Sequence, residues 1–303
     1  MEIFSTGSSL ISKSGERVMK KRIGLVLEGG GMRCIYSCGM LDYFMEQELY
    51  FPYVISVSAG AFLGMNYIAR QIGRSKKCCI DYIKKHPYIS WKNAFLKGSL
   101  FDMELLFDTL PNKELPFDYD TFFAAEEKLV MAVSDCELAK PMYITGLKDR
   151  KLLMDYCRAS NSLPLVSKIV TIKGRPLMDG GMLDAIPIRK SIADGNHKNV
   201  IILTQQAGYR KSPTKKSIRL ARLKYKKYPE FVKQMEERPN KYNETLDFIR
   251  ELEEKGEAFV IRPEVPPVGT ATQKVKKLKS FYEYGYAYAK KIFPELLAFI
   301  EGK

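Results

Sequence analysis

Apolar runs with the length of β-strands alternate with helical periodicity along the first two thirds of the chain. Residues 23–27, 53–57 and 200–203 are the clearest runs, and their β-branched content indicates buried strands. Strands separated by helices predict an α/β layered fold with a mainly parallel sheet. Further strands are predicted at 129–133, 142–145, 169–172 and 258–261, and helices at 32–48, 62–72, 76–86, 102–110 and 149–158.

The pattern changes near residue 210, after which it is mostly helical. Apolar side chains recur at three- and four-residue spacing between Ile218 and Met235 and again between Leu278 and Ile292. Pro229 interrupts the first stripe, which therefore predicts two helices. We expect a loosely ordered leader at 1–20, an α/β domain at 21–209, and a basic helical extension at 210–303 packed on that domain.

The composition is that of a globular protein with a sizeable core, because 46% of the residues are hydrophobic. No apolar run reaches the length of about 20 residues that crosses a bilayer. The first residues lack the basic start and apolar stretch of a signal peptide, so we expect a cytoplasmic protein. The six cysteines form no CxxC pair and have no His at ligand spacing, so we expect buried thiols and no zinc. No cofactor is expected.

The net charge of +14 is unevenly distributed along the chain. Residues 211–303 hold 21 Lys and Arg against 13 Asp and Glu, so this third carries a surplus of 8. One interpretation is solvated basic faces on packed helices, and the other is a surface that contacts an anionic membrane. Nucleic acid is not an expected partner, because no nucleic-acid-binding motif is present.

A run of glycines follows the first predicted strand and opens the next helix. The segment reads Glu28-Gly29-Gly30-Gly31-Met32-Arg33. Glycines expose backbone N–H groups, and a helix N-terminus adds partial positive charge, so this loop suits a phosphate or a developing oxyanion. As a dinucleotide fingerprint it is weak, because Cys34 stands where Gly or Ala is required and no acidic residue ends the next strand.

A serine between small residues follows the second predicted strand. The segment Ser56-Val57-Ser58-Ala59-Gly60 matches the nucleophile elbow G-x-S-x-G except at Ser56. Such an elbow is a sharp strand-to-helix turn that lifts the serine hydroxyl out of the sheet. A third segment, Asp179-Gly180-Gly181, follows the predicted strand at 169–172, and taken alone it is equally typical of a structural turn.

These segments, in this order and spacing, resemble those of the patatin-like phospholipases. A fourth feature of that family is an Ala-Ser-x-x-x-Pro segment ahead of the Asp motif, and here it is Ala159-Ser160-Asn161-Ser162-Leu163-Pro164. The resemblance covers about residues 22–205. It implies a three-layer α/β/α domain and hydrolysis of lipid esters by a Ser–Asp dyad without metal.

The resemblance also implies roles for individual residues. Ser58 would be the nucleophile and Asp179 the base, and the amides around Gly29, Gly30, Gly31 and Arg33 would form the oxyanion hole. The motif is supported by Ser56, Gly60, Gly180 and Gly181. Cys34 and Ser56 depart from the family pattern, but both are small, so we expect altered rate or preference rather than loss of chemistry.

Two alternatives remain open at the level of sequence. The order Ser58, Asp179, His197 also fits the triad of an α/β-hydrolase esterase, although the Gly-rich loop and the elbow come early in the chain for that fold. The other histidine, His86, precedes a proline on a Lys-rich segment and is expected at the surface. The second alternative is a non-catalytic, basic lipid-binding or scaffold protein with a relic hydrolase fold.

Overall fold

The computed structural model describes residues 23–86, 90 and 98–302, and the predicted leader at 1–20 lies outside this part of the chain. Every strand expected from the sequence is present among the described residues, with ends shifted by at most a few positions. The described strands are β1 (Ile23–Leu27), β2 (Tyr53–Val57), β3 (Lys128–Asp135), β4 (Lys140–Ile144), β5 (Val170–Ile172), β6 (Arg175–Asp179), β7 (Lys198–Ile202) and β8 (Ala258–Ile261).

These strands form one sheet in the order β5-β6-β3-β2-β1-β7-β8, with β4 also paired to β3. The pairs that join β3, β2, β1, β7 and β8 are parallel, so the predicted mainly parallel sheet is confirmed. The pairs that involve β4, β5 and β6 are antiparallel. Leu27 pairs with Ser56, which brings the segments that follow β1 and β2 to the same edge of the sheet.

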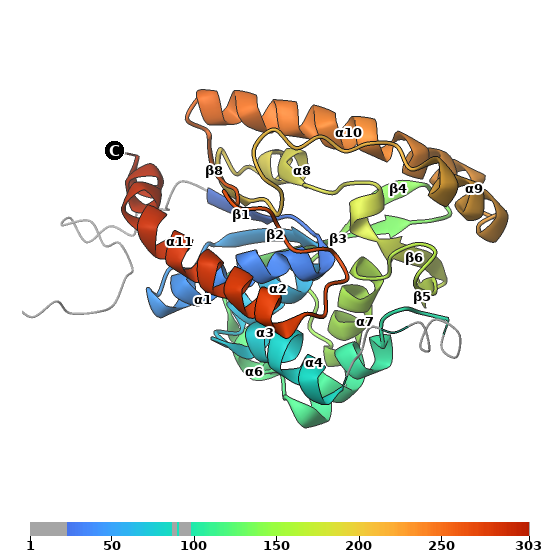
Figure 1. Ribbon diagram of the computed structural model, residues 1–303, viewed down its shortest axis with the longest axis horizontal. Coiled ribbons are helices and arrows are strands. Elements are labelled where there is room, and N and C mark those ends of the chain that lie inside the picture. The colour runs from blue at the N-terminus through green and yellow to red at the C-terminus, as the bar shows by residue number, and fades with distance from the viewer. Residues whose placement is uncertain (1–22, 87–89, 91–97, 303) are drawn as a thin grey trace, which may run out of the picture.

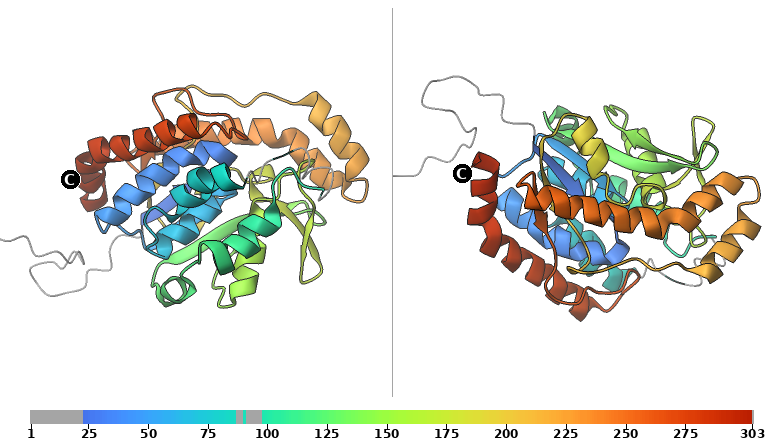
Figure 2. Two further views of the ribbon diagram at one scale, coloured as in Figure 1. Left: turned by 60° about the horizontal axis from the view of Figure 1, so that its bottom comes forward. Right: turned by 90° about the horizontal axis from the view of Figure 1, so that it is seen from above.

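Helices cover both faces of the sheet and make the predicted three-layer α/β/α fold (Figure 1). On one face lie α1, α2, α7 and α11, which share a core with the large apolar residues beneath them. On the other face lie α8 and α10, and α10 runs across this face in Figure 2. The helices are α1 (Ile35–Glu46), α2 (Ala59–Ile68), α3 (Arg74–Lys76), α4 (Tyr82–Lys85), α6 (Tyr119–Ala124), α7 (Arg150–Ser160), α8 (Ile188–Ala193), α9 (Lys215–Lys224), α10 (Pro229–Glu254) and α11 (Val275–Glu301).

The structure differs from the sequence-based expectation mainly in the helices of the first face. The helix predicted at 62–72 corresponds to α2, which begins earlier, directly after Ser58. The segment predicted at 76–86 is divided among α3, a π-helical turn at Lys77–Asp81 and α4. The segment predicted at 102–110 is a π-helix at Leu105–Glu114, and Pro111 lies inside it. A proline lacks the N–H that a regular α-helix needs at that position.

The C-terminal third adds to both layers and to the sheet itself. Pro229 begins α10, so the predicted break between two helices is confirmed. Strand β8 pairs with β7 at the sheet edge. Helix α11 lies along α1 (Figure 2), and each presents a glycine to the other: a Cβ on Gly285 would lie 2.2 Å from the Tyr36 carbonyl oxygen, and one on Gly39 would lie 2.2 Å from that of Tyr282. Such backbone proximity buries the apolar stripe of α11.

No helix in the described ranges has the length and apolar character that a membrane span requires. The division of the chain at residue 209 stays a prediction.

Candidate active site

Ser58 occupies a strained turn between β2 and α2. Its backbone angles are φ 55° and ψ −130°, in a region that residues with a side chain rarely adopt. This is the geometry of a nucleophile elbow, in which the hydroxyl is directed away from the strand. The residue is 8% exposed and lines two cavities, so it is largely shielded from solvent but open to a ligand.

Ser160, at the end of α7, holds this turn in place. Its hydroxyl accepts a hydrogen bond from the Ser58 backbone N–H (2.8 Å) and donates one to the Ala132 carbonyl of β3 (2.7 Å). Ser58 and Ala132 are both buried, and backbone polar groups away from water need hydrogen-bond partners. The Ala-Ser-x-x-x-Pro segment therefore ties the elbow to the neighbouring strand, a role that its sequence did not indicate.

Small residues allow the chain to pass close to the elbow. A Cβ on Gly60 would lie 2.8 Å from the Leu27 carbonyl oxygen, so this position requires glycine. Ser56, which replaces the first glycine of the motif, is fully buried, and its hydroxyl donates to the Val130 carbonyl of β3 (3.4 Å). Because helix α2 presents Gly64 at this point, the Ser56 side chain fits beneath it.

Asp179 ends β6 and faces Ser58 across the sheet edge. Its Oδ2 accepts a hydrogen bond from the Ser58 hydroxyl (2.7 Å), and its Oδ1 accepts one from the Gly181 N–H (2.7 Å). Gly180 packs against β3, where a Cβ would lie 2.2 Å from the Ala132 carbonyl oxygen. The third motif thus both orients the carboxylate and places it against the Ser58 hydroxyl.

The environment of Asp179 suits a base that works near neutral pH. Its side chain is 1% exposed, and burial raises its pKa from 3.8 to about 6. The hydrogen bonds from Ser58 and Gly181 and the positive charges of Arg238 and Lys211 oppose this rise. The carboxylate is therefore ionised at pH 7 yet basic enough to accept a proton.

The Gly-rich loop lies beside Ser58. A Cβ on Gly29 would come within 2.7 Å of the Ser58 Cβ. Within the described residues, no protein acceptor takes the N–H of Gly29, Gly30 or Gly31. The N–H of Arg33 instead donates to the Gly30 carbonyl (3.2 Å), so Arg33 contributes its side chain rather than its amide to the site.

Cys34 contacts the start of the Gly-rich loop through its side chain. Its buried thiol donates to the Glu28 carbonyl at 3.5 Å, and burial raises its pKa far above the usual range. A thiol that stays protonated behaves as a small apolar side chain. The departure from glycine at this position is therefore accommodated by packing.

Two cavities meet at Ser58, which lines both of them together with Gly31 and Leu163. The first, of about 80 Å³, is mostly apolar. The second, of about 170 Å³, is polar and contains Asp179 and the Gly-rich loop. The apolar cavity is lined by Met32, Ala59, Phe62, Cys78, Cys79, Phe101, Met103, Leu106, Phe107 and Asn161 in addition to the three shared residues.

The polar cavity contains residues that the sequence did not assign to the site. Lys211 and Arg238 come from the basic C-terminal third, where the sequence predicted a solvated or membrane-facing surface. Glu28 is buried, and its carboxylate accepts hydrogen bonds from Thr204 and from the Tyr242 hydroxyl (2.6 Å). Of Lys211, Arg238 and Glu28, only Glu28 belongs to a motif that the sequence analysis identified, because it begins the Gly-rich segment.

The alternative Ser–Asp–His triad is wrong. His197 is exposed and precedes Lys198, which pairs with Ile23 at the start of β1, whereas Ser58 follows the strand end where Leu27 pairs with Ser56. Four residues of strand separate these two edges by about 13 Å. His86 is also exposed and stacks on Tyr82 at 5.0 Å between ring centroids. In the part of the chain that the structure describes, no three His, Cys, Asp or Glu side chains cluster as metal ligands would.

Comparison with known families identifies the fold. A sequence model of the patatin-like phospholipases matches residues 25–192, more than half of the chain. The chain belongs to the patatin-like phospholipase family. This patatin-like domain supports a lipid hydrolase activity in general terms. A second model, a domain of unknown function (DUF6363), matches residues 228–301.

Two further proteins resemble this patatin-like chain. The uncharacterized protein YjjU of Escherichia coli (strain K12) is 30% identical over 188 residues, which are 60% of this chain and 52% of that protein. The chain thus spans about half the length of this relative. The crystal structure of VipD from Legionella pneumophila superimposes with a TM-score of 0.51 at 13% identity, covering 91% of this chain and 67% of VipD, and supports the fold alone.

Proposed function

We propose that the protein is a lipid acyl ester hydrolase in which Ser58 is the nucleophile and Asp179 the general base. The observation that carries the proposal is the 2.7 Å hydrogen bond from the Ser58 hydroxyl, at the strained elbow, to the buried Asp179 carboxylate. A serine hydroxyl needs an adjacent base to become nucleophilic, and this carboxylate is in position to take its proton. The family membership agrees with this chemistry.

The reaction proceeds in two balanced steps. Asp179 takes the Ser58 proton as Oγ attacks the ester carbonyl, and the same proton then passes to the departing alcohol, which leaves an acyl-serine. Asp179 next deprotonates a water that attacks the acyl-serine, and the proton returns to Ser58 as the fatty acid departs. Gly29, Gly30 and Gly31 line the same cavity as Ser58, and we assign their N–H groups to stabilising the oxyanion in both steps; such donors are worth about 10²–10³-fold each.

The apolar cavity favours a fatty acyl chain as the group transferred to Ser58. Phe62, Phe101 and Phe107 line it directly beside the nucleophile. Burial of methylene groups contributes about 0.8 kcal/mol each, so a chain of several carbons would be held firmly.

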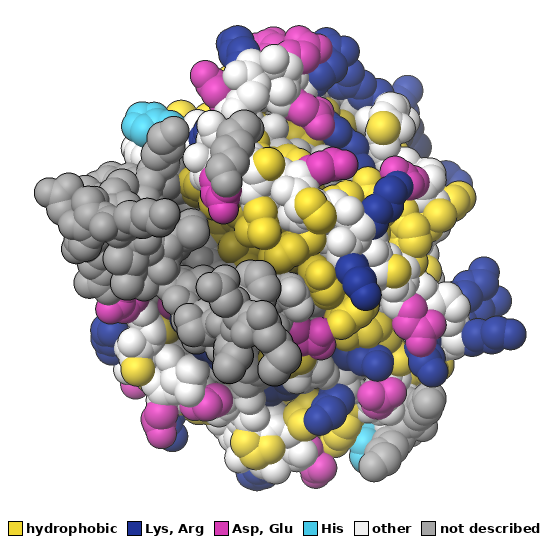
Figure 3. Space-filling model, turned by 90° about the vertical axis from the view of Figure 1, so that its left-hand side faces the viewer, with side chains coloured by type: hydrophobic (Ala, Val, Ile, Leu, Met, Phe, Trp, Pro, Cys, Tyr) yellow, Lys and Arg dark blue, Asp and Glu magenta, His cyan; other side chains and the backbone are white. Residues whose placement is uncertain are grey.

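We also propose that the protein contacts anionic membranes peripherally through α9. Leu220 and Leu223 are 57% and 65% exposed on this helix, beside Lys215, Lys216 and Arg219. These three cations form no ion pair within the described residues. Apolar side chains among unpaired cations are typical of helices that lie in the membrane interface. By contrast, the face in Figure 3 mixes Lys and Arg with Asp and Glu.

Hydrogen bonds connect the end of α9 to a segment that lines the candidate site. Tyr225, which follows α9, accepts a hydrogen bond from the Leu165 N–H (2.8 Å), and Lys224 donates to the Leu165 carbonyl (3.4 Å). Leu163, two residues earlier, lines both cavities at Ser58. The end of α9 therefore contacts the segment that lines both cavities.

Covalent labelling tests the hydrolase proposal. A fluorophosphonate probe should label the wild type and not Ser58→Ala, and hydrolysis of monoacylglycerol should disappear in the same variant. Equal labelling of Ser58→Ala would remove Ser58 as nucleophile. A folded wild type that neither reacts nor hydrolyses would favour a non-catalytic lipid-binding protein with a relic hydrolase fold.

Vesicle sedimentation tests the membrane proposal. Anionic vesicles should bind the wild type at low salt and release it as salt rises, because charges are screened within about 8 Å at physiological ionic strength. Leu220→Ser/Leu223→Ser should weaken binding, whereas Lys255→Glu, an exposed change at the far end of α10, should affect it less. Equal binding to neutral vesicles at every salt concentration would contradict the proposal.

A further inference from the structure

Three cations line the polar cavity at Ser58, and they outnumber its acids. Arg33, Lys211 and Arg238 face Glu28 and Asp179 around the same space of about 170 Å³. With Asp179 ionised the lining carries one excess positive charge, and with Asp179 protonated it carries two. Like charges gathered in a confined space favour an anionic occupant.

The two acids are already engaged by other donors. Both Glu28 oxygens accept hydrogen bonds, from Thr204 and Tyr242, and the Asp179 oxygens accept from Ser58 and Gly181. Among the residues that the structure describes, neither Lys211 nor Arg238 forms an ion pair within 4 Å.

The cations retain donors for an incoming group. Arg238 donates its Nε to the Gly181 carbonyl, which orients the guanidinium and leaves its terminal nitrogens. Lys211 places its ammonium 4.8 Å from the centre of the Tyr242 ring. Burial, followed by the nearby Arg238, lowers the pKa of Lys211 to about 8. A bound anion would relieve both the desolvation and the repulsion.

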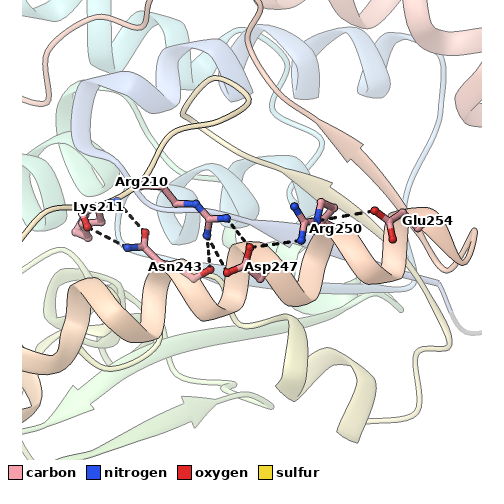
Figure 4. Close-up of polar contacts among 6 residues, drawn as sticks. All are labelled: Arg210, Lys211, Asn243, Asp247, Arg250 and Glu254. Atoms are coloured by element: carbon pink, nitrogen blue, oxygen red, sulfur yellow. Dashed lines mark hydrogen bonds and ion pairs between the residues drawn. The ribbon is translucent and has the colours of Figure 1, made fainter.

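Helix α10 supplies one cation and fixes the other. Asn243 accepts a hydrogen bond from the Lys211 N–H (2.8 Å) and donates one to the Lys211 carbonyl (3.1 Å). The adjacent Arg210 binds Asp247 with both terminal nitrogens, as Figure 4 shows. The two hydrogen bonds with Asn243 attach the Lys211 backbone to α10, and this attachment places Lys211 at the cavity. Neither cation lies in the segment matched by the patatin-like model, and Arg238 lies in the domain of unknown function.

We propose that Lys211 and Arg238 form a subsite for the phosphate of an acyl glycerophosphate-type lipid, whose ester is presented to Ser58. The proposal rests on the hydrolase function proposed above. In such a lipid, glycerol carbons join the acyl ester to the phosphate, so the two groups can occupy adjoining spaces. The acyl chain enters the apolar cavity and the phosphate enters the polar one, with Ser58 at their junction. A planar guanidinium and a compact ammonium are the donors that proteins use for phosphate.

The test compares two soluble substrates with the same short acyl chain, a lysophosphatidate and a monoacylglycerol. Rates are measured below the concentration at which either substrate aggregates, without vesicles, and well above the pKa of Asp179. Wild type should prefer the lysophosphatidate in kcat/KM. Lys211→Gln should reduce this preference about tenfold or more, the scale of one charge-assisted hydrogen bond, while monoacylglycerol hydrolysis persists.

Three further variants complete the design. Lys211→Arg should retain the preference, and Arg238→Gln should reduce it if that variant folds. Lys255→Gln removes an exposed lysine of the same extension and should leave both rates unchanged. Inorganic phosphate should inhibit monoacylglycerol hydrolysis in wild type and less in Lys211→Gln.

The outcomes separate the possibilities. An unchanged substrate ratio in Lys211→Gln overturns the subsite. An equal fall in both rates means that the cation acts only on Asp179, which also overturns it. Inhibition by inorganic phosphate without any preference for lysophosphatidate would assign the cavity to free phosphate instead of a lipid headgroup. Absence of hydrolysis and of probe labelling in wild type would refute the hydrolase function itself, a result distinct from these.

Discussion

Replacing Asp179 by Asn should remove activity and stabilise the fold, because the carboxylate that we propose as the base is also a buried charge. The rise of its pKa from 3.8 to about 6 corresponds to a cost of about 3 kcal/mol for ionising it in the folded state. Below about pH 4 the group is protonated in both states and costs nothing. Between about pH 4 and 6 the folded state keeps a proton that the unfolded state has lost, so stability falls as pH rises.

Asparagine fits the same hydrogen bonds without the charge. Its oxygen can accept from the Gly181 N–H, as Asp179 does now, and its amide can donate to the Ser58 hydroxyl. We expect Asp179→Asn to gain up to about 3 kcal/mol in the free energy of unfolding at pH 7 and little near pH 4. Turnover should fall by about 10²-fold or more, the scale of general base catalysis.

Denaturant unfolding at the two pH values and steady-state hydrolysis of a monoacylglycerol measure the two effects. Asp184→Asn is a matched control, because burial also raises the pKa of Asp184 while its partner is the Tyr143 hydroxyl (2.6 Å) and not Ser58. The control should alter stability but not turnover. A folded Asp179→Asn with near wild-type turnover would rule out the dyad. A variant less stable than wild type at pH 7 would refute the electrostatic argument.

Three further outcomes are expected. The double variant His86→Ala/His197→Gln should retain most hydrolytic activity, because both rings are exposed and away from the nucleophile; a loss of about 10³-fold in a folded protein would contradict this. Ser56→Gly should keep its activity, whereas Ser56→Val should lose about 1–3 kcal/mol and some turnover, measured by thermal melts and rates, because α2 leaves no space for a branched side chain. Ser160→Ala should destabilise the protein by about 1–3 kcal/mol in urea unfolding, because the Ser58 N–H loses its acceptor; an unchanged midpoint would show that the elbow does not depend on it.

The sheet and its motifs could be predicted because each rests on a local pattern. Buried parallel strands are continuous apolar runs, and glycines are required where backbones pass closely, as at Gly60 against Leu27. Strand β6 was not predicted because it includes Pro176, and a proline disfavours a strand inside a sheet. The strand nevertheless accommodates Pro176, and its last residue, Asp179, contacts the Ser58 hydroxyl.

The polar cavity could not be predicted because a periodic sequence pattern does not distinguish a lysine that faces water from one that faces a buried acid. Lys211 precedes α9 and Arg238 lies within α10, among many similar cations. What distinguishes them is tertiary: α10 crosses the sheet beside the ends of β1 and β6, so Arg238 meets Gly181 and Tyr242 meets Glu28. The site is therefore completed by the C-terminal third. Two of the cations that the sequence assigned to the surface, Lys211 and Arg238, instead line the cavity beside Ser58.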